Sequence, residues 1–247
     1  MDAVLVTAAI FGLLLCGCSV SGVEGIGVNY GMIGNNLPSP DKVIALYRAS
    51  NITDIRLFHP DTTVLAALRG SGLGVVLGTL NEDLARLATD ASFAASWVQS
   101  YVQPFAGAVR FRYINAGNEV IPGDEAASVL PAMRNLQSAL RAAGLGVPVT
   151  TVVATSKAGG QGLEVVVSET GWPSGGGGAG ASVENAAAYS NNLVRHVGRG
   201  TPRRPGKAVE TYIFAMFNEN QKPEGVEQNF GLFHPDMSAV YHVDFSA

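Results

Sequence analysis

The run Leu163-Glu164-Val165-Val166-Val167-Ser168-Glu169-Thr170-Gly171-Trp172-Pro173-Ser174 decides the class of fold. Its first residues are typical of a β-strand, and a carboxylate, Glu169, follows where that strand ends. An earlier stretch, Asn115-Ala116-Gly117-Asn118-Glu119-Val120, places Glu119 at the end of a strand in the same way. Cleavage of a glycosidic bond needs such a pair, because one carboxyl group protonates the leaving oxygen while the other attacks or activates water. The two stretches indicate a barrel glycosidase.

Strand-like and helix-like segments alternate along the chain, which predicts a parallel sheet with helical crossovers. We expect strands at residues 25–30, 54–58, 74–80, 109–116, 147–154, 163–167 and 209–217. We expect one helix that begins at Pro40 behind a Ser39 cap and two more over residues 62–69 and 81–101. A fourth helix presents Met133, Leu136 and Leu140 on one face and ends before Gly144. A fifth runs over 183–196 behind a Ser182 cap. The fold class is therefore α/β, and about eight such units predict a (β/α)8 TIM barrel.

The alternation fails between the fifth strand and the next one. Only eight residues, Thr155 to Gly162, join these two segments. Parallel neighbours need a crossover of about a dozen residues or more, so a helix does not fit there. We therefore expect about seven strands and an incomplete barrel.

Further motifs accompany the two carboxylate stretches. They are Ile26-Gly27-Val28-Asn29-Tyr30-Gly31, Ile33-Gly34-Asn35-Asn36-Leu37-Pro38 and Phe214-Ala215-Met216-Phe217-Asn218-Glu219-Asn220-Gln221-Lys222. In this order, and together with Gly-Asn-Glu and Ser-Glu-Thr-Gly-Trp-Pro-Ser, they resemble the plant β-1,3-glucanases of glycoside hydrolase family 17. The resemblance runs from about Gly25 to the C-terminus.

In the resembling enzymes, a helix, a sixth strand with aromatic residues facing the cleft and another helix occupy the place of the break. Here Ser156 is followed by Lys157-Ala158-Gly159-Gly160, which looks like the end of the later helix. The resemblance thus implies one barrel domain over residues 23–247 that lacks a helix–strand–helix segment at about 156/157. A splice variant, a pseudogene product or a gene-model error would each produce this gap.

The resemblance also implies an activity, the endo-hydrolysis of β-1,3-glucan polysaccharide with retention of configuration. It implies a plant enzyme of carbohydrate metabolism, placed outside the cell in the apoplast or cell wall and used in plant defence. The alternative is a catalytically impaired or vestigial barrel that holds glucan without cleaving it. Release of reducing sugar from laminarin separates the two.

Glu119 is the candidate general acid/base and Glu169, by the family match, the candidate nucleophile. A retaining mechanism brings two such carboxyl groups to about 5 Å from one another. Asn118 is a candidate hydrogen-bond partner for the sugar 2-hydroxyl, a contact that strengthens in the transition state. The structural alternatives are a loop carboxylate that pairs with a surface cation, for Glu119, and one that caps the glycine-rich turn, for Glu169.

Further residues are candidates for contact with the substrate. The aromatic residues Tyr30 and Phe58 follow the first two strands, and Trp172 would support its loop or stack on a sugar face. Charged positions after the last strand match the family's cleft. They are Glu219, Lys222 and Glu227, which could tune the carboxylates through like and opposite charge. The alternatives are core packing for the aromatic residues and a solvated loop for the charged ones.

The N-terminus indicates export. Ala3 to Leu15 form a short apolar run followed by small residues, which is typical of a secretory signal peptide over residues 1–22. Both cysteines, Cys16 and Cys18, lie inside it, so the mature chain would have neither disulfide nor thiol. The run is far shorter than the ~20 residues of a membrane span, and we expect no membrane anchor. Asn51-Ile52-Thr53 is a glycosylation sequon.

Composition excludes or disfavours several other classes of function. The chain has 47% apolar and 15% charged residues and a net charge of −4, which is typical of a globular protein and gives nucleic-acid binding little support. A basic cluster at residues 199–207 is interpreted as a solvated loop. The four histidines show no metal-ligand spacing, so we expect neither a metal nor a cofactor. We expect a monomer.

Overall fold

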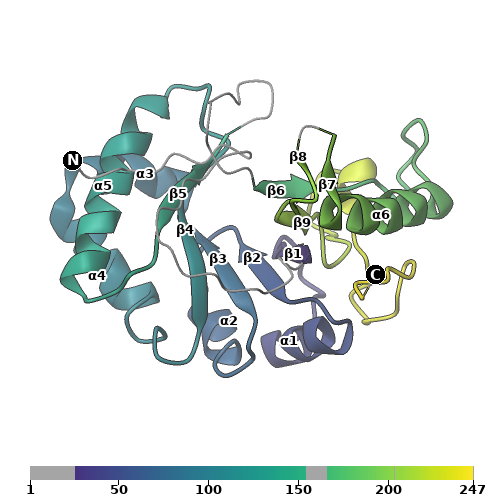
Figure 1. Cartoon of the computed structure of the whole chain (residues 1–247), viewed down its shortest axis with the longest axis horizontal. Helices are drawn as coiled ribbons and strands as arrows, with labels where there is room; N and C mark the ends of the chain where they lie inside the picture. The colour runs from purple at the N-terminus through teal and green to yellow at the C-terminus, as the bar shows by residue number, and fades with distance from the viewer. Residues whose placement is uncertain (1–25, 154–165, 203, 247) are drawn as a thin grey trace. The chain divides into compact units, whose positions relative to one another are not determined.

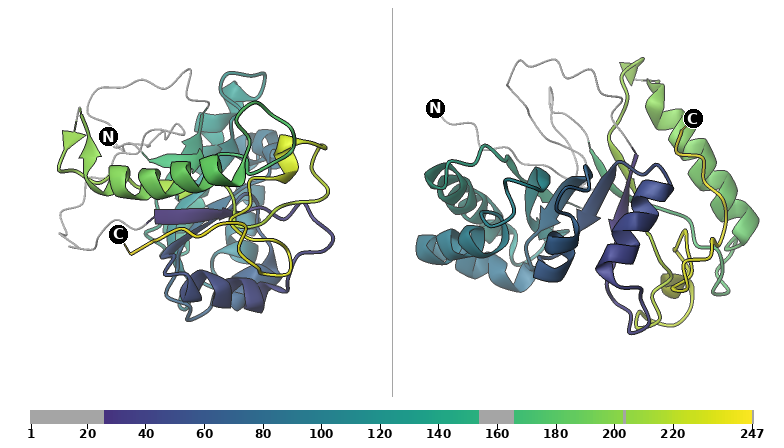
Figure 2. Two further views of the ribbon diagram at one scale, coloured as in Figure 1. Left: turned by 90° about the vertical axis from the view of Figure 1, so that its right-hand side faces the viewer. Right: turned by 90° about the horizontal axis from the view of Figure 1, so that it is seen from below.

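The structure is a computed structural model that describes residues 26–153, 166–202 and 204–246. Figures 1 and 2 draw the chain coloured by residue number. Its residues group into two compact units. Unit 1 takes its described residues from the middle of the chain, from Leu57 to Ser168. Unit 2 takes them from both ends, up to Arg56 and from Glu169 onward. The signal-peptide segment, both cysteines and the junction at Ser156 lie outside the described residues.

Unit 1 holds three parallel strands in the order β5-β4-β3. They are β3 (Gly74–Gly78), β4 (Arg110–Asn118) and β5 (Val149–Val152). Its helices are α2 (Thr62–Ala67), α3 (Leu84–Thr89), α4 (Ala91–Tyr101) and α5 (Ala126–Ala142), with a 3-10 turn, η1 (Asn81–Asp83). All five residues of β3 are buried, as expected for a strand covered on both faces. The apolar face of α5 is buried through Met133, Leu136 and Leu140, which confirms the predicted helix face.

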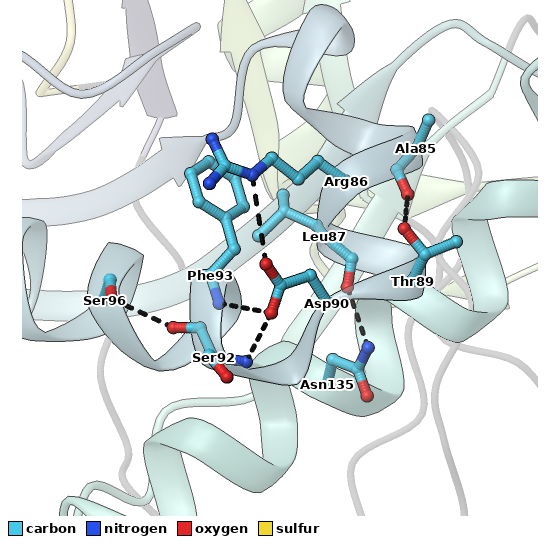
Figure 3. A network of polar contacts seen from close by, with 9 residues as sticks. All are labelled: Ala85, Arg86, Leu87, Thr89, Asp90, Ser92, Phe93, Ser96 and Asn135. Carbon is cyan, nitrogen blue, oxygen red and sulfur yellow. Dashed lines mark hydrogen bonds and ion pairs between the residues drawn. The ribbon is translucent and has the colours of Figure 1, made fainter.

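A polar network fixes the corner between α3 and α4 (Figure 3). The Asp90 carboxylate accepts hydrogen bonds from the backbone N–H groups of Ser92 and Phe93, at 2.9 and 3.0 Å. The Arg86 guanidinium stacks 4.1 Å above the centre of the Phe93 ring, and Asn135 of α5 donates to the Leu87 carbonyl at 2.8 Å. These bonds satisfy backbone groups at both helix ends that would otherwise have no partner in the helices.

Unit 2 contains β1 (Ile26–Tyr30), α1 (Pro40–Ala49), the first three residues of β2 (Asp54–Leu57), the last two of β6 (Val167–Thr170), α6 (Val183–Gly198), β9 (Thr211–Ile213) and a 3-10 turn, η3 (Val226–Gln228). The strand order here is β2-β1-β9-β6, and β1 pairs with β9 in parallel. Tyr47 of α1 is fully buried, and its hydroxyl donates to the Val28 carbonyl at 3.1 Å. This bond ties the helix to the first strand.

In the part of the chain that the structure describes, β5 and β6 are edge strands. There β5 pairs with β4 alone and β6 pairs with β9 alone. The expectation that the strand before Glu169 does not join the fifth strand is thus confirmed for the described residues, which contain seven strands in this sheet. Over the same residues, no helix has both the length and the apolar character to cross a membrane.

The predicted strand bounds differ from the observed ones by one residue or more, and three strands show how. The strand predicted at 163–167 is β6, which is described from Val167 and extends to Thr170, where the Phe214 N–H, directly after the neighbouring β9, donates to the Thr170 carbonyl. The strand predicted at 209–217 is shorter, because the backbone of Ala215 pairs with Phe230 and Leu232 instead of continuing β9. The strand predicted at 147–154 begins at Val149.

Three other predictions also need correction. The helical stretch predicted over 81–101 breaks at Asp90, because this residue caps a second helix. Ser39 precedes α1 as predicted, but its side chain makes no capping hydrogen bond, whereas Ser182 accepts from the Asn185 N–H as expected. The cluster at 199–207, interpreted as a loop, contains a short hairpin of β7 (Gly200–Thr201) and β8 (Arg204–Pro205).

Candidate active site

In unit 1, the candidate acid Glu119 directly follows β4. Its side chain is exposed, and its backbone N–H donates to the Val152 carbonyl of β5 at 2.9 Å. Its φ of 53° lies in the left-handed region, which costs a non-glycine residue about 1–3 kcal/mol. Gly117, two residues earlier, also has a positive φ, of 77°. The sequence Gly-Asn-Glu thus bends the chain sharply where the strand ends, and strain of this kind is concentrated at functional sites.

Asn118 is held by a residue that the sequence analysis did not single out. The Asn81 side chain accepts from the Asn118 backbone N–H at 2.7 Å and donates to the Asn118 carbonyl at 2.9 Å. Two hydrogen bonds therefore fix the backbone between Gly117 and the strained Glu119. Phe58 also lies in unit 1 and is half-buried after β2. A Cβ atom on Gly78 would come within 2.2 Å of the Phe58 carbonyl oxygen, so β3 needs glycine there.

In unit 2, the candidate nucleophile Glu169 lies on β6 beside a buried arginine. The Arg56 Nη1 is 2.6 Å from the Glu169 Oε1. The Arg56 side chain is 2% exposed and that of Glu169 is 27% exposed. A charge-assisted bond at this distance fixes one carboxylate oxygen and keeps the carboxylate in one orientation.

Glu219 carries a buried carboxylate in the same unit and is 3% exposed. Its Oε1 accepts from the Ile33 N–H at 2.7 Å, and its Oε2 lies 3.3 Å from the Lys222 Nζ. The same ammonium lies 4.1 Å from the centre of the Phe214 ring, a cation–π contact. A Cβ atom on Gly31 would come within 2.3 Å of the Glu219 Oε2, so the first motif needs glycine to admit this side chain. The contact between Glu219 and Lys222 is a direct one between two predicted site residues.

The remaining candidates differ in exposure. Trp172 is 37% exposed; its Nε1 donates to the Gly180 carbonyl at 2.9 Å and its ring lies 5.8 Å from that of Tyr189. Tyr30 is buried, at 3% exposure, and packs edge-on against Phe217. Glu227 is exposed in η3. The sugar contacts of these residues stay predictions.

Sequence reasoning missed Arg56, the partner of the candidate nucleophile. A signal was present, because Asp54-Ile55-Arg56-Leu57 places an arginine between two apolar residues of a strand. Arginine is almost never fully buried unless it is paired. An arginine in such a strand therefore predicts a buried acidic partner, but the sequence does not say which one.

Comparison with known proteins bears on both halves of the chain. A model of the glycosyl hydrolases family 17 matches residues 26–156 and 149–245 in two pieces. The barley (Hordeum vulgare) protein GVI, whose name assigns it provisionally to the glucan endo-1,3-beta-glucosidases, is 59% identical over 319 positions that cover 92% of this chain and 99% of that protein. Barley glucan endo-1,3-beta-glucosidase GII is 39% identical, over 90% of this chain and 92% of its own length.

A solved structure from work on two plant beta-glucan endohydrolases with distinct substrate specificities is 36% identical, with a TM-score of 0.84 over 89% of this chain and all of that one. The chain belongs to the glycosyl hydrolases family 17. Its fold is an incomplete (β/α)8 barrel.

The comparison with GVI also measures the gap. The alignment has 319 positions, but 92% of a 247-residue chain is only about 227 residues, so about 92 positions have no residue of this chain. The family model breaks into two pieces at residues 149–156, where the sequence predicts the missing segment.

Proposed function

We propose that this chain is an endo-acting hydrolase of β-1,3-glucan that retains the configuration at the anomeric carbon, with Glu119 as general acid/base and Glu169 as nucleophile. The observation that carries the proposal is the Glu169 carboxylate, held at a strand end by the buried Arg56 at 2.6 Å, in a chain of this family. Two plant relatives that are named as glucan endo-1,3-beta-glucosidases support the substrate.

The reaction takes two steps. In the first, Glu119 gives its proton to the glycosidic oxygen while Glu169 attacks the anomeric carbon, the glycosidic bond breaks and a sugar ester of Glu169 forms. In the second, the Glu119 carboxylate takes a proton from water, whose oxygen attacks the same carbon, and Glu169 leaves. Two inversions restore the original configuration. Because Oε1 of Glu169 is bound by Arg56, Oε2 is the attacking oxygen in this proposal.

Other side chains would hold the glucan. We assign Asn118 to the 2-hydroxyl of the sugar at the cleavage point, and Tyr30, Phe58 and Trp172 to contacts with sugar rings. The exposure of Trp172 favours a stacking role. We assign the charged residues Lys222 and Glu227 to the rim of the substrate site, and the buried Glu219 to the support of Lys222 through their ion pair.

Two measurements test the mechanism. The product released from laminarin, followed early by NMR, should keep its β configuration; an α product would exclude Glu169 as the nucleophile. A 2-fluoro glucoside with a good leaving group should label the peptide that contains Glu169, because the covalent intermediate accumulates when its hydrolysis is slow. Glu169→Gln should remove both labelling and nearly all turnover. The matched control Glu224→Gln changes an exposed carboxylate of the same unit and should leave both unchanged.

A second candidate function, the binding of glucan without its cleavage, has support from the missing segment. The chain lacks about 92 positions of its barley relative, and β5 and β6 each have one partner in the described residues. Such a barrel could bind glucan and fail to cleave it. Retention of the chain on insoluble β-1,3-glucan, with no reducing sugar released from laminarin, would favour this function.

We also propose that the chain is exported to the plant cell wall and acts there in defence. The apolar run from Ala3 to Leu15 and the plant origin of the relatives support this. N-terminal sequencing of the secreted protein should find a start near residue 23. A secreted protein that begins at Met1 would contradict cleavage.

A further inference from the structure

Asn51 lies in a helix-ending turn with its side chain on the surface. The Asn51 N–H donates to the Arg48 carbonyl at 3.2 Å and the Ile52 N–H donates to the Tyr47 carbonyl at 3.0 Å. This is the Schellman arrangement that ends many helices. Ile52 and Tyr47 are both buried, at 2% and 0% exposure, and they occupy the two positions at which apolar residues commonly accompany this turn.

Glycine would suit the backbone conformation of this turn better than asparagine does. Asn51 has a φ of 57°, and glycine adopts that conformation without a penalty from Cβ. Helix termination alone therefore does not require asparagine. Asparagine does have one property that glycine lacks, a side-chain amide that can be glycosylated in the sequence Asn-Ile-Thr.

Both outer residues of this sequon are exposed, whereas the middle one is buried. Asn51 and Thr53 lie on the surface while Ile52 anchors the turn. The turn thus fixes the direction of Asn51 on a rigid helix end, where a large attached group would not disturb the core.

Beside Asn51 is a pocket of about 260 Å³ that lies wholly within unit 2. The end of α1 forms one wall, through Ala49, Ser50 and Asn51, and the C-terminal segment Tyr241–Phe245 forms another. The exposed His242 and the half-exposed Phe245 give this wall a polar group and an aromatic ring. A sugar has both apolar ring faces and hydroxyl groups, so it matches such a wall.

We propose that Asn51 carries an N-linked glycan and that the first N-acetylglucosamine of this glycan lies in the pocket against Tyr241–Phe245. The Asn51 Nδ2 forms a bond to C1 of the sugar, the bond from C1 to the diphosphate of a lipid-linked oligosaccharide breaks, the lipid diphosphate leaves and the amide loses one proton. The glycan then covers the C-terminal segment.

The test is expression of the full chain in plant cells, in parallel behind its own N-terminus and behind the host's secretory leader. Peptide N-glycosidase should increase the gel mobility of the secreted protein and convert Asn51 to aspartate in the tryptic peptide Ala49–Arg56. Recovery of that peptide with unmodified asparagine from protein secreted by the host leader would overturn the glycan. Glycosylation behind the host leader alone would support the glycan and overturn the proposed export.

Substitutions separate the modification from the turn. Thr53→Ser keeps the sequon and should keep the mobility shift, whereas Thr53→Ala should lose it. Asn51→Gly suits the left-handed turn and should lose the shift without loss of stability. Amide exchange of residues 241–245 should be slower in the glycosylated protein than in Asn51→Gly. Equal exchange in the two proteins would overturn the placement of the sugar in the pocket.

Discussion

Replacement of Arg56 by methionine tests whether the buried pair with Glu169 supports the fold. The variant keeps an unbranched side chain in the core but removes the charge that lies 2.6 Å from the Glu169 carboxylate. Removal of one partner from a fully buried ion pair costs about 3–5 kcal/mol. The Glu169 side chain keeps 27% exposure, so water offsets part of this cost. We expect a loss of about 2–3 kcal/mol in the free energy of unfolding.

Urea unfolding followed by circular dichroism measures this loss. Arg48→Met is a matched control, because Arg48 is exposed at the end of α1, and we expect it to cost less than about 1 kcal/mol. Arg56→Lys should fall between the parent and Arg56→Met, since lysine keeps the charge but not the planar geometry of the guanidinium. An Arg56→Met variant within about 0.5 kcal/mol of the parent would refute the assignment of this pair to the stability of unit 2.

Three more results are expected. Asp90→Ala should cost about 1 kcal/mol in urea unfolding because it removes the bonds to Ser92 and Phe93, whereas Asp90→Asn keeps an acceptor and should cost less; equal losses would contradict the capping role. Burial raises the pKa of Tyr47 well above its usual value near 10, so the stability from this neutral phenol is complete below pH 10 and falls as the pH rises further. Tyr47→Phe should weaken that alkaline fall and cost about 1 kcal/mol at neutral pH through the lost bond to Val28; an unchanged pH profile in urea titrations would contradict it. The 247-residue chain should melt about 10–20 °C below barley GII and release far less sugar from laminarin. The reason is that a missing strand and two helices lower the free energy of unfolding by about 5 kcal/mol or more. Comparable melting and turnover would show this to be wrong.

Two helix starts in this chain follow from local signals. Ser182 before an apolar face starts α6 at Val183, and the structure places its hydroxyl on the Asn185 N–H. The same holds for α1, where Pro40 is the first helical residue. Signals of this kind lie within a few residues of the element and can be read without knowledge of the fold.

The ends of strands depend on partners that lie far away along the chain, so local sequence predicts these ends poorly. β9 is short because residues near 230 take the backbone groups of Ala215, and no local pattern announces this. The candidate site divides in the same way. Glu119 and Glu169 are predicted from the sequence because each follows an apolar strand, whereas Arg56 and Asn81 contact partners that lie 113 and 37 residues away along the chain.

The pairing of β1 with β9 also sets an order of events during synthesis. Ile26 faces Thr211 in this ladder, so a ribosome that adds about 5–20 residues per second makes the second partner about 10–40 s after the first. The described residues of unit 1 form one stretch of the chain apart from the gap at 154–165, and they are all made before those of unit 2 are complete. The first strand, with its apolar Ile26 and Val28, must therefore remain unpaired on that side until residues 211–213 have been made. During this interval we expect the nascent chain to depend on chaperones that cover such strands.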